Sequence, residues 1–282
     1  MLSKFCRGYL LIFILAVIGV NFIDAGFYTS VQAAHMMAGP TWTAPFGFDA
    51  LGRNLFLRTL YSAQVSLFLG FISAISCLLF GFLFGWMMSL QPKSVQNIFL
   101  RFLEICLSIP TLLMLLVVSV LWQENVSVFF RFLPPAWQNI LALAVCLSAC
   151  GWFSFARFSW RILAEQKQMP YMQSAVVIGA TRSQMWLRYI WPNVRIDILV
   201  FFGLQIPHFL LAEGLLSFLG FGIHSPQSSW GLLFFDGWKM ISVAPHLIIG
   251  PAVIFSLTVF CLVFSLYRYQ KTQDPILRWQ TY

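Results

Sequence analysis

Two ionisable residues, Glu213 and His208, lie in one apolar stretch of the chain. A carboxylate among apolar neighbours is costly in a membrane, so it is a functional-site hypothesis by default. Two roles are open to Glu213: contact with a polar solute or a proton, or a structural role in which it pairs with Arg53 or caps the loop that follows. The pattern favours the structural role. A lone histidine in an apolar helix usually packs, although His208 could also line a polar pathway.

The residue pattern gives little support for metal binding or catalysis. The six cysteines include no CxxC pair and the four histidines are scattered, so we expect no metal site and assign the cysteines to helix packing. The sequence has no GxxxxGK[ST] phosphate loop, so we expect no bound ATP or Mg²⁺ in this chain. No constellation of His, Asp and Ser gathers at the ends of the apolar runs, so we expect no enzyme activity.

The elements that position these residues are predicted to be membrane-spanning helices. Of 282 residues, 60% are hydrophobic and only 9% are charged, against about 25% charged in a soluble domain. A bilayer core of about 30 Å needs about 20 apolar residues per helix. Six runs meet this requirement: Gly8–Ile23, Val65–Leu90, Leu103–Trp122, Ile140–Phe158, Ile196–Ser217 and Ala244–Tyr267. The sequence predicts an all-α membrane protein with six transmembrane helices and both termini on one side.

The distribution of Lys and Arg predicts which side that is. If the N-terminus is cytoplasmic, 13 of the 17 basic residues fall in cytoplasmic segments, and the outside keeps Arg53, Arg58, Arg131 and Lys239. Both termini are therefore expected in the cytoplasm. Topology and anionic lipid headgroups account for the net charge of +8, so we expect no nucleic-acid partner. The first run resembles a signal peptide but lacks a clear cleavage site, and we expect it to stay as a helix.

The largest basic loop carries a short amphipathic block, Tyr171–Asn193. Apolar residues at helical spacing stand on both sides of Gly179, which permits a sharp turn, and Pro192 is expected to stop the second run. The apolar residues before the glycine form a predicted ridge: Met172, Ala175, Val176 and Ile178. The block indicates a helix-turn-helix that docks a soluble partner. An interfacial hairpin lying against lipid is the alternative.

This block resembles the EAA loop of binding-protein-dependent ABC importer permeases. That loop has a Glu-Ala-Ala triplet, a glycine four residues later and a Leu-Pro further on. The residues that fit the pattern are Ser174, Ala175, Gly179, Ala180, Pro192 and Asn193. By this resemblance the first helix of the block is the coupling helix, which lies in a groove of a cytoplasmic ATPase subunit.

Two further motifs resemble the dipeptide, oligopeptide and nickel subfamily of these permeases. FGFDALGRN, from Phe46 to Asn54, is similar to its (H)PxGTDxxGRD signature, and LLAEGLLSFLGFGIHSPQSSWG, from Leu210 to Gly231, is similar to its AEAxLSFLGLGxxPPxxxWG. Asp274 and Pro275 match the usual DP of the tail. The motifs stand in the family's order over about residues 46 to 275, and the chain is identified as a member in the C-type position.

The chain departs from the family pattern at four places. Gln173 replaces the acid of the EAA triplet, Phe48 replaces the threonine of the GTD signature, Asn54 replaces its closing aspartate, and Pro226 stands without the second proline. The loss of the acid removes one anionic contact to the partner. Because the glycine turn and the apolar face remain, we expect docking to persist.

The resemblance implies a type I ABC importer permease architecture in a single domain, residues 1–282. The first helix and the periplasmic segment take about residues 1–63 and the core permease about residues 64–282. The implied coupling residues are Tyr171, Gln173, Ser174, Ala175, Gly179, Ala180 and Pro192, and the pathway or periplasmic-loop candidates are Glu213, His208, Asp49, Arg53 and Trp230.

The resemblance also implies partners and a location, the bacterial inner membrane. They are a homologous second permease, two cytoplasmic ATPase subunits that hold ATP and Mg²⁺, a periplasmic substrate-binding protein and membrane lipid. The implied cargo is a peptide first, and nickel or another small solute second. The alternative is a self-contained secondary transporter driven by protons through Glu213 and His208, which would be active without any ATPase.

Overall fold

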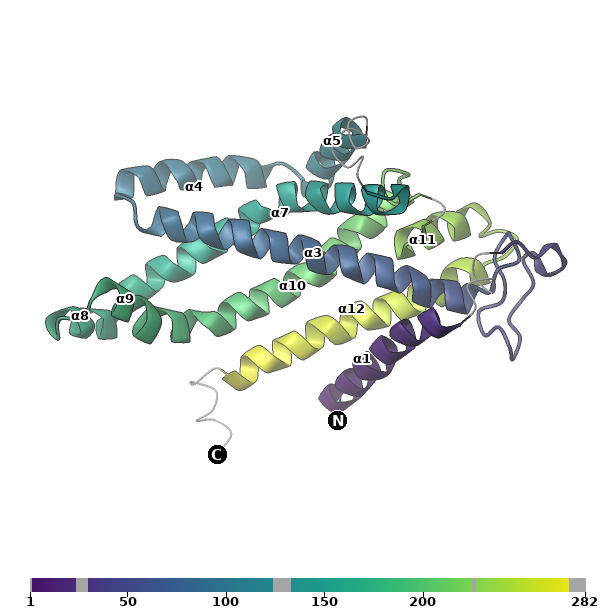
Figure 1. Cartoon of the computed structure of the whole chain (residues 1–282), viewed down its shortest axis with the longest axis horizontal. Helices are drawn as coiled ribbons and strands as arrows, with labels where there is room; N and C mark the ends of the chain where they lie inside the picture. Colours follow the sequence, from purple (N-terminus) through teal and green to yellow (C-terminus); the bar gives the residue numbers. More distant parts are fainter. Residues whose placement is uncertain (1, 24–29, 124–132, 225–226, 274–282) are drawn as a thin grey trace.

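The computed structural model describes residues 2–23, 30–123, 133–224 and 227–273, and these residues form helices and loops with no strand. Figure 1 shows a bundle of long helices with short helices at its two ends. The α-helices are α1 (Leu2–Gly19), α3 (Leu55–Ser89), α4 (Lys93–Ser108), α5 (Thr111–Gln123), α7 (Pro135–Lys167), α8 (Pro170–Val177), α9 (Arg182–Gln184), α10 (Trp191–Phe218), α11 (Trp230–Lys239) and α12 (His246–Gln273). Two 3₁₀ turns, η1 (Val20–Phe22) and η2 (Ala33–His35), and one π-helix, η3 (Met185–Ile190), complete the described elements.

Five of the six predicted spans are confirmed as long apolar helices. The run Leu103–Trp122 is not a single straight span. It is divided between α4 and α5, which meet at an angle of 84°. Pro110 causes the break, because proline forces the residue before it out of the helical region, and Ile109 is extended, with φ −75° and ψ 128°. The count of six spans holds when this bent pair is taken as one.

Helix α3 is the centre of the bundle. Its 35 residues extend about 52 Å, more than the bilayer core needs, and it packs along α7 and crosses α10 (Figure 1). Glycines allow the close contact with α7: a Cβ added at Gly81 would lie 2.6 Å from the Cβ of Phe155, and one at Gly85 would lie 2.7 Å from the carbonyl oxygen of Ala156. Small residues of this kind let helix backbones approach each other in membranes.

The two ends of the bundle carry different structures. Helices α8 and α9 stand at one end, and the segment before α3 lies with α11 at the other end (Figure 1). Helix α1 packs beside α12, where the Tyr9 and Thr258 hydroxyls lie 3.0 Å apart. The first turn of α1 and the last turn of α12 both point toward the end that holds α8 (Figure 1). The predicted division near residue 63 stays a prediction.

Candidate functional site

The turn after α8 is built by Gly179 and Ala180. Helix α8 begins with Pro170 in its first turn, where the missing N–H costs nothing. At its end the Ala180 N–H donates to the Ala175 carbonyl and the Gly179 N–H to the Val176 carbonyl, both at 3.0 Å. This is a Schellman cap, which needs a left-handed residue, and Gly179 has φ +80°. The backbone that reverses the chain therefore favours glycine at this position.

The chain re-enters a helix immediately after this turn. Thr181 and Gln184 form a capping box, in which the Gln184 N–H donates to the Thr181 hydroxyl at 3.3 Å and the Thr181 N–H donates to the Gln184 side-chain oxygen at 3.0 Å. Two local motifs thus hold the hairpin between α8 and α9. Neither depends on contacts with the rest of the bundle.

The apolar ridge predicted on α8 is divided between two faces, so the prediction of one continuous ridge is wrong. Met172 and Ala175 are buried against the bundle. Val176, Val177 and Ile178 are 60%, 88% and 78% exposed. The reason is helical geometry: residues three apart share one face, and contacts with the bundle take that face. The three consecutive residues of the last turn form the exposed tip of α8. Gln173 and Ser174 are also exposed.

Pro192 does not stop the helix, which corrects a second prediction. It lies in the first turn of α10, and residues Arg182–Phe218 form one continuous helical rod of 37 residues. The π-helix η3 accommodates the proline. The Trp191 N–H reaches back five residues to the Trp186 carbonyl, and the Asn193 side-chain amide donates to the Tyr189 carbonyl at 2.6 Å.

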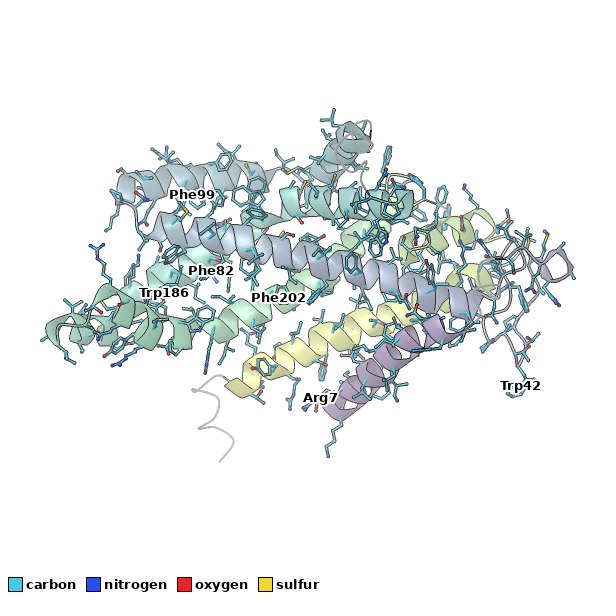
Figure 2. The ribbon with its side chains drawn as sticks, viewed as in Figure 1. Arg7, Trp42, Phe82, Phe99, Trp186 and Phe202 are labelled. Atoms are coloured by element: carbon cyan, nitrogen blue, oxygen red, sulfur yellow. The ribbon has the colours of Figure 1, made fainter. Side chains whose placement is uncertain are left out.

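Aromatic contacts fix the hairpin to the bundle. The Trp186 ring lies 6.3 Å from Phe82 and 6.0 Å from Trp86, both on α3, and Figure 2 shows Phe82 and Trp186 together between the helices. The Tyr171 ring stacks on Tyr189, and its hydroxyl donates to the Gln166 side chain. Burial raises the Tyr171 pKa above its ordinary value. Sequence patterns gave no sign of the two α3 residues.

At the opposite end Asp49 organises the FGFDALGRN segment. Its Oδ1 accepts the N–H groups of Leu51 and Arg53, each at 2.9 Å. Its Oδ2 accepts from the Arg53 Nε and from a guanidinium nitrogen of Arg58, each at 2.7 Å. A second nitrogen of Arg58 lies 3.3 Å from an Asp236 oxygen in α11. The buried Arg58 thus joins this segment to α11. The sequence analysis did not predict this role, because no local sequence pattern indicates it.

Glu213 is buried and joins three elements. Its two oxygens accept from the Ser66 hydroxyl of α3 at 2.9 Å and from the Ser217 hydroxyl at 2.7 Å. The Ser217 hydroxyl in turn accepts the Ile223 N–H at 3.1 Å, in the loop that leads to α11. The expected partner, Arg53, is occupied by Asp49 instead. The carboxylate therefore orders the loop after α10 through serine hydroxyls. No cation of the described residues lies within ion-pair distance of it.

The remaining candidate residues have separate surroundings. Trp230 is buried: its indole N–H donates to the Thr59 carbonyl and its backbone N–H to the Ser66 hydroxyl, both at 3.2 Å. His208 is exposed on α10, and no hydrogen bond among the described residues joins it to Glu213. Pro226, Asp274 and Pro275 lie outside the described residues.

The structure is a membrane bundle that presents a helix-turn-helix with an apolar tip at one end. Residues 77–279 match the family model of the binding-protein-dependent transport system inner membrane component. The chain belongs to this family. It is a multi-spanning permease subunit of a binding-protein-dependent ABC importer in the inner membrane.

Named relatives agree with this class. The oligopeptide transport system permease protein OppC of Haemophilus influenzae is 32% identical over 85% of this chain and 73% of its own length. The dipeptide transport system permease protein DppC of Bacillus subtilis is 30% identical over 95% of this chain and 80% of its own. A crystal structure of an amino acid ABC transporter matches with TM-score 0.48 and 19% identity, over 78% of this chain and 93% of that one.

Proposed function

We propose that this chain imports peptides, as the C-type permease that pairs with a homologous second permease around one pathway. The relatives named for oligopeptide and dipeptide transport support peptides as the first cargo. Nickel or another small solute is the second. The chain itself performs no covalent chemistry in this proposal.

The exposed tip of α8 carries the proposal. Val176, Val177 and Ile178 form a small apolar surface beside the Gly179 turn, at the end of the bundle that we assign to the cytoplasm. An apolar anchor of this kind suits a groove on a soluble partner. In the proposal each of two ATPase subunits, which hold the ATP and Mg²⁺, takes one such tip, one from each permease. A periplasmic binding protein delivers cargo at the opposite end.

The continuous rod supplies a route for motion. When the ATPase dimer closes, it displaces α8 together with α9, and the unbroken helical segment Arg182–Phe218 carries that displacement into α10. At the far end of α10, Glu213 and Ser217 connect it to α3 and to the loop before α11. The displacement of the tip therefore reaches the opposite end as a movement of packed helices, which would switch the pathway between its two openings.

The proposal places both termini in the cytoplasm. The distribution of basic residues supports this side. The first turn of α1 and the last turn of α12 also point toward the end that holds α8 (Figure 1).

The test is to replace the most exposed tip residue by a charge. Val177→Glu should remove co-purification of the ATPase subunits in mild detergent and ATP-dependent uptake, because an apolar groove rejects an unpaired carboxylate. Trp42→Glu is the matched control, since Trp42 is fully exposed at the opposite end (Figure 2), and it should keep the ATPases bound. Normal ATPase binding by Val177→Glu, or proton-driven uptake by the chain reconstituted alone, would contradict the proposal.

A further inference from the structure

A groove of about 1030 Å³ lies between α3 and α10, and Tyr269 near the end of α12 borders it. Residues four apart share one face of a helix, and two such sets line the groove: Leu78, Phe82 and Trp86 from α3, and Trp191, Arg195 and Leu199 from α10. Figure 2 shows Phe82 and Phe202 in the space between the two helices. Leu79 and Leu199 are 63% and 51% exposed, so the groove is open toward the outside of the bundle.

The groove is polar at one end only. Three lining residues on three helices mark that end: Trp86, Arg195 and Tyr269. Each lies within four residues of the end of a predicted apolar run, so all three stand at the boundary of the membrane that is nearer to α8. Trp and Tyr are enriched at this level of a bilayer. Toward the membrane centre the lining is entirely apolar, as far as Leu78 and Phe202.

The length of the groove matches one leaflet of a bilayer. From Arg195 to Phe202 it follows α10 for seven residues, about 10 Å, and from Trp86 to Leu78 it follows α3 for eight residues, about 12 Å. Half of the hydrocarbon core is about 15 Å thick. The groove therefore ends before the centre of the membrane. An acyl chain fits this length, whereas a helix that spans the bilayer extends well beyond it.

The charge of the groove favours an anion. Arg195 is exposed and has no ion-pair partner within 4.0 Å in the described part of the chain. No Asp or Glu of the described residues lines the groove. A guanidinium binds phosphate through two parallel N–H groups, but the ammonium of a zwitterionic headgroup would find no carboxylate in this lining. Basic pockets between spans on the cytoplasmic side bind anionic lipid headgroups in this way.

We propose that this groove binds one anionic phospholipid of the cytoplasmic leaflet. Its phosphate lies on Arg195, and one acyl chain follows the apolar lining between α3 and α10 toward Phe202. The rings of Trp86 and Trp191 stand beside the glycerol, where aromatic side chains are favoured. The choice of leaflet rests on the proposed function, which assigns this end of the bundle to the cytoplasm, whereas the binding itself depends only on the groove.

The experiment is photolabelling of the complete importer in nanodiscs of phosphatidylcholine. A trace of phosphatidylglycerol carries a photoreactive diazirine on its acyl chain, and labelled peptides are identified by mass spectrometry after illumination. We expect the label within residues 78–86 and 191–202. Phosphatidylcholine with the same photoreactive chain should label these peptides at least fivefold less. Equal labelling by the two lipids would show ordinary boundary lipid and would overturn the proposal.

Variants of one arginine test the role of the charge. Arg195→Gln should lower phosphatidylglycerol labelling at least fivefold, and Arg195→Lys should keep at least half of it, because the positive charge remains. Arg157→Gln is the matched control: Arg157 is exposed near the end of another apolar run and does not line the groove. It should change the labelling by no more than twofold. An equal loss in Arg157→Gln and Arg195→Gln would reflect net charge alone and would overturn the site.

A soluble competitor separates a lipid from a free anion. Glycerol phosphate carries the phosphate of the headgroup without acyl chains, and it should not displace the photoreactive phosphatidylglycerol. Displacement by glycerol phosphate would reduce the groove to an anion site and would overturn a bound acyl chain.

A second measurement identifies the occupant from the side of the protein. Photoreactive benzoylphenylalanine in place of Leu199 should form an adduct with lipid when the complete importer is illuminated. An adduct with the second permease would show that protein covers the groove, and would overturn the proposal. Neither measurement requires transport, so absence of ATP-dependent import would overturn the proposed function and leave the lipid site standing. A reversed orientation would overturn only the choice of leaflet.

Discussion

At the scale of single residues, Glu213 is the clearest case of a buried charge with a structural environment. Serine hydroxyls from α3 and α10 donate to both of its oxygens, and the same serines accept the N–H groups of Trp230 and Ile223. Removal of the carboxylate would leave two buried hydroxyl donors without acceptors, at about 1 to 3 kcal/mol each. A glutamine of the same size would keep one acceptor, and its amide could donate to a serine, which has two acceptor lone pairs.

We therefore predict that Glu213→Gln keeps ATP-dependent uptake within about threefold of wild type, whereas Glu213→Leu lowers both thermal stability and uptake. Thermal unfolding of the purified complex and uptake in proteoliposomes measure the two effects. A glutamine variant that is folded but inactive would show that Glu213 carries a proton or contacts cargo, and would favour the secondary-transporter alternative.

One departure from the family motif is structurally conservative. Asn54 is the N-cap of α3, and its side chain accepts the N–H groups of Phe56 and Leu57 at 3.1 and 3.2 Å. Asparagine and aspartate cap helices about equally well. The replacement therefore keeps the start of α3 in place. Gln173, the other polar departure, is exposed on α8, and its effect on coupling stays a prediction.

At the scale of elements, the hairpin of α8 and α9 is locally determined. Its turn depends on one left-handed residue, Gly179, and a Cβ at this position would meet no atom within 4 Å. A substitution there therefore does not clash with the described part of the chain. The cost is conformational, about 1 to 2 kcal/mol for most residues and less for Asn and Asp.

We accordingly predict that Gly179→Asp assembles normally in the membrane but lowers ATP-dependent uptake at least tenfold, because its charge enters the ATPase groove beside the apolar tip. Gly179→Asn is the matched control of the same shape without the charge, and it should keep most of the uptake. Protein in the membrane and uptake are measured on the same preparations. Equal uptake by the two variants would exclude a role for charge at this turn.

At the scale of the whole molecule, the two ends of the bundle must face opposite sides of the membrane. The spans connect the α8 hairpin to the segment around Asp49, at the opposite end of α3 (Figure 1). Trp42 is fully exposed at one end, and Gln168, just before α8, is exposed at the other. These positions can report orientation without disturbing packing.

We predict that, in cells whose outer membrane has been made permeable, an impermeant maleimide labels Trp42→Cys and leaves Gln168→Cys unlabelled, in a cysteine-depleted chain. Opening the inner membrane should make Gln168→Cys reactive, which is the positive control. Labelling at position 168 before that step would reverse the orientation and remove the coupling loop from the cytoplasm.

Part of this fold can be predicted from the sequence, because it depends only on residues that are close together in the chain. Five spans followed from hydropathy, because about 20 apolar residues in a row are themselves the condition for crossing a bilayer. The turn at Gly179 could also be predicted, because its helix cap involves only neighbouring residues. The break at Pro110 also has a local cause, because a proline forces the residue before it out of the helical region.

Tertiary structure decided the rest, because contacts between distant residues depend on which helix faces meet. Ser66 and Glu213 are 147 positions apart in the sequence, and Arg58 and Asp236 are 178 positions apart. No local sequence pattern predicts that either pair is in contact. The α8 ridge was divided because the bundle covers only one side of that helix. Pro192 continues a helix it was expected to stop, because it lies in the first turn of α10, directly after the π-helical turn η3. The sequence by itself determined the spans and the turn, whose causes are local, and only the packed bundle decided which of their side chains meet.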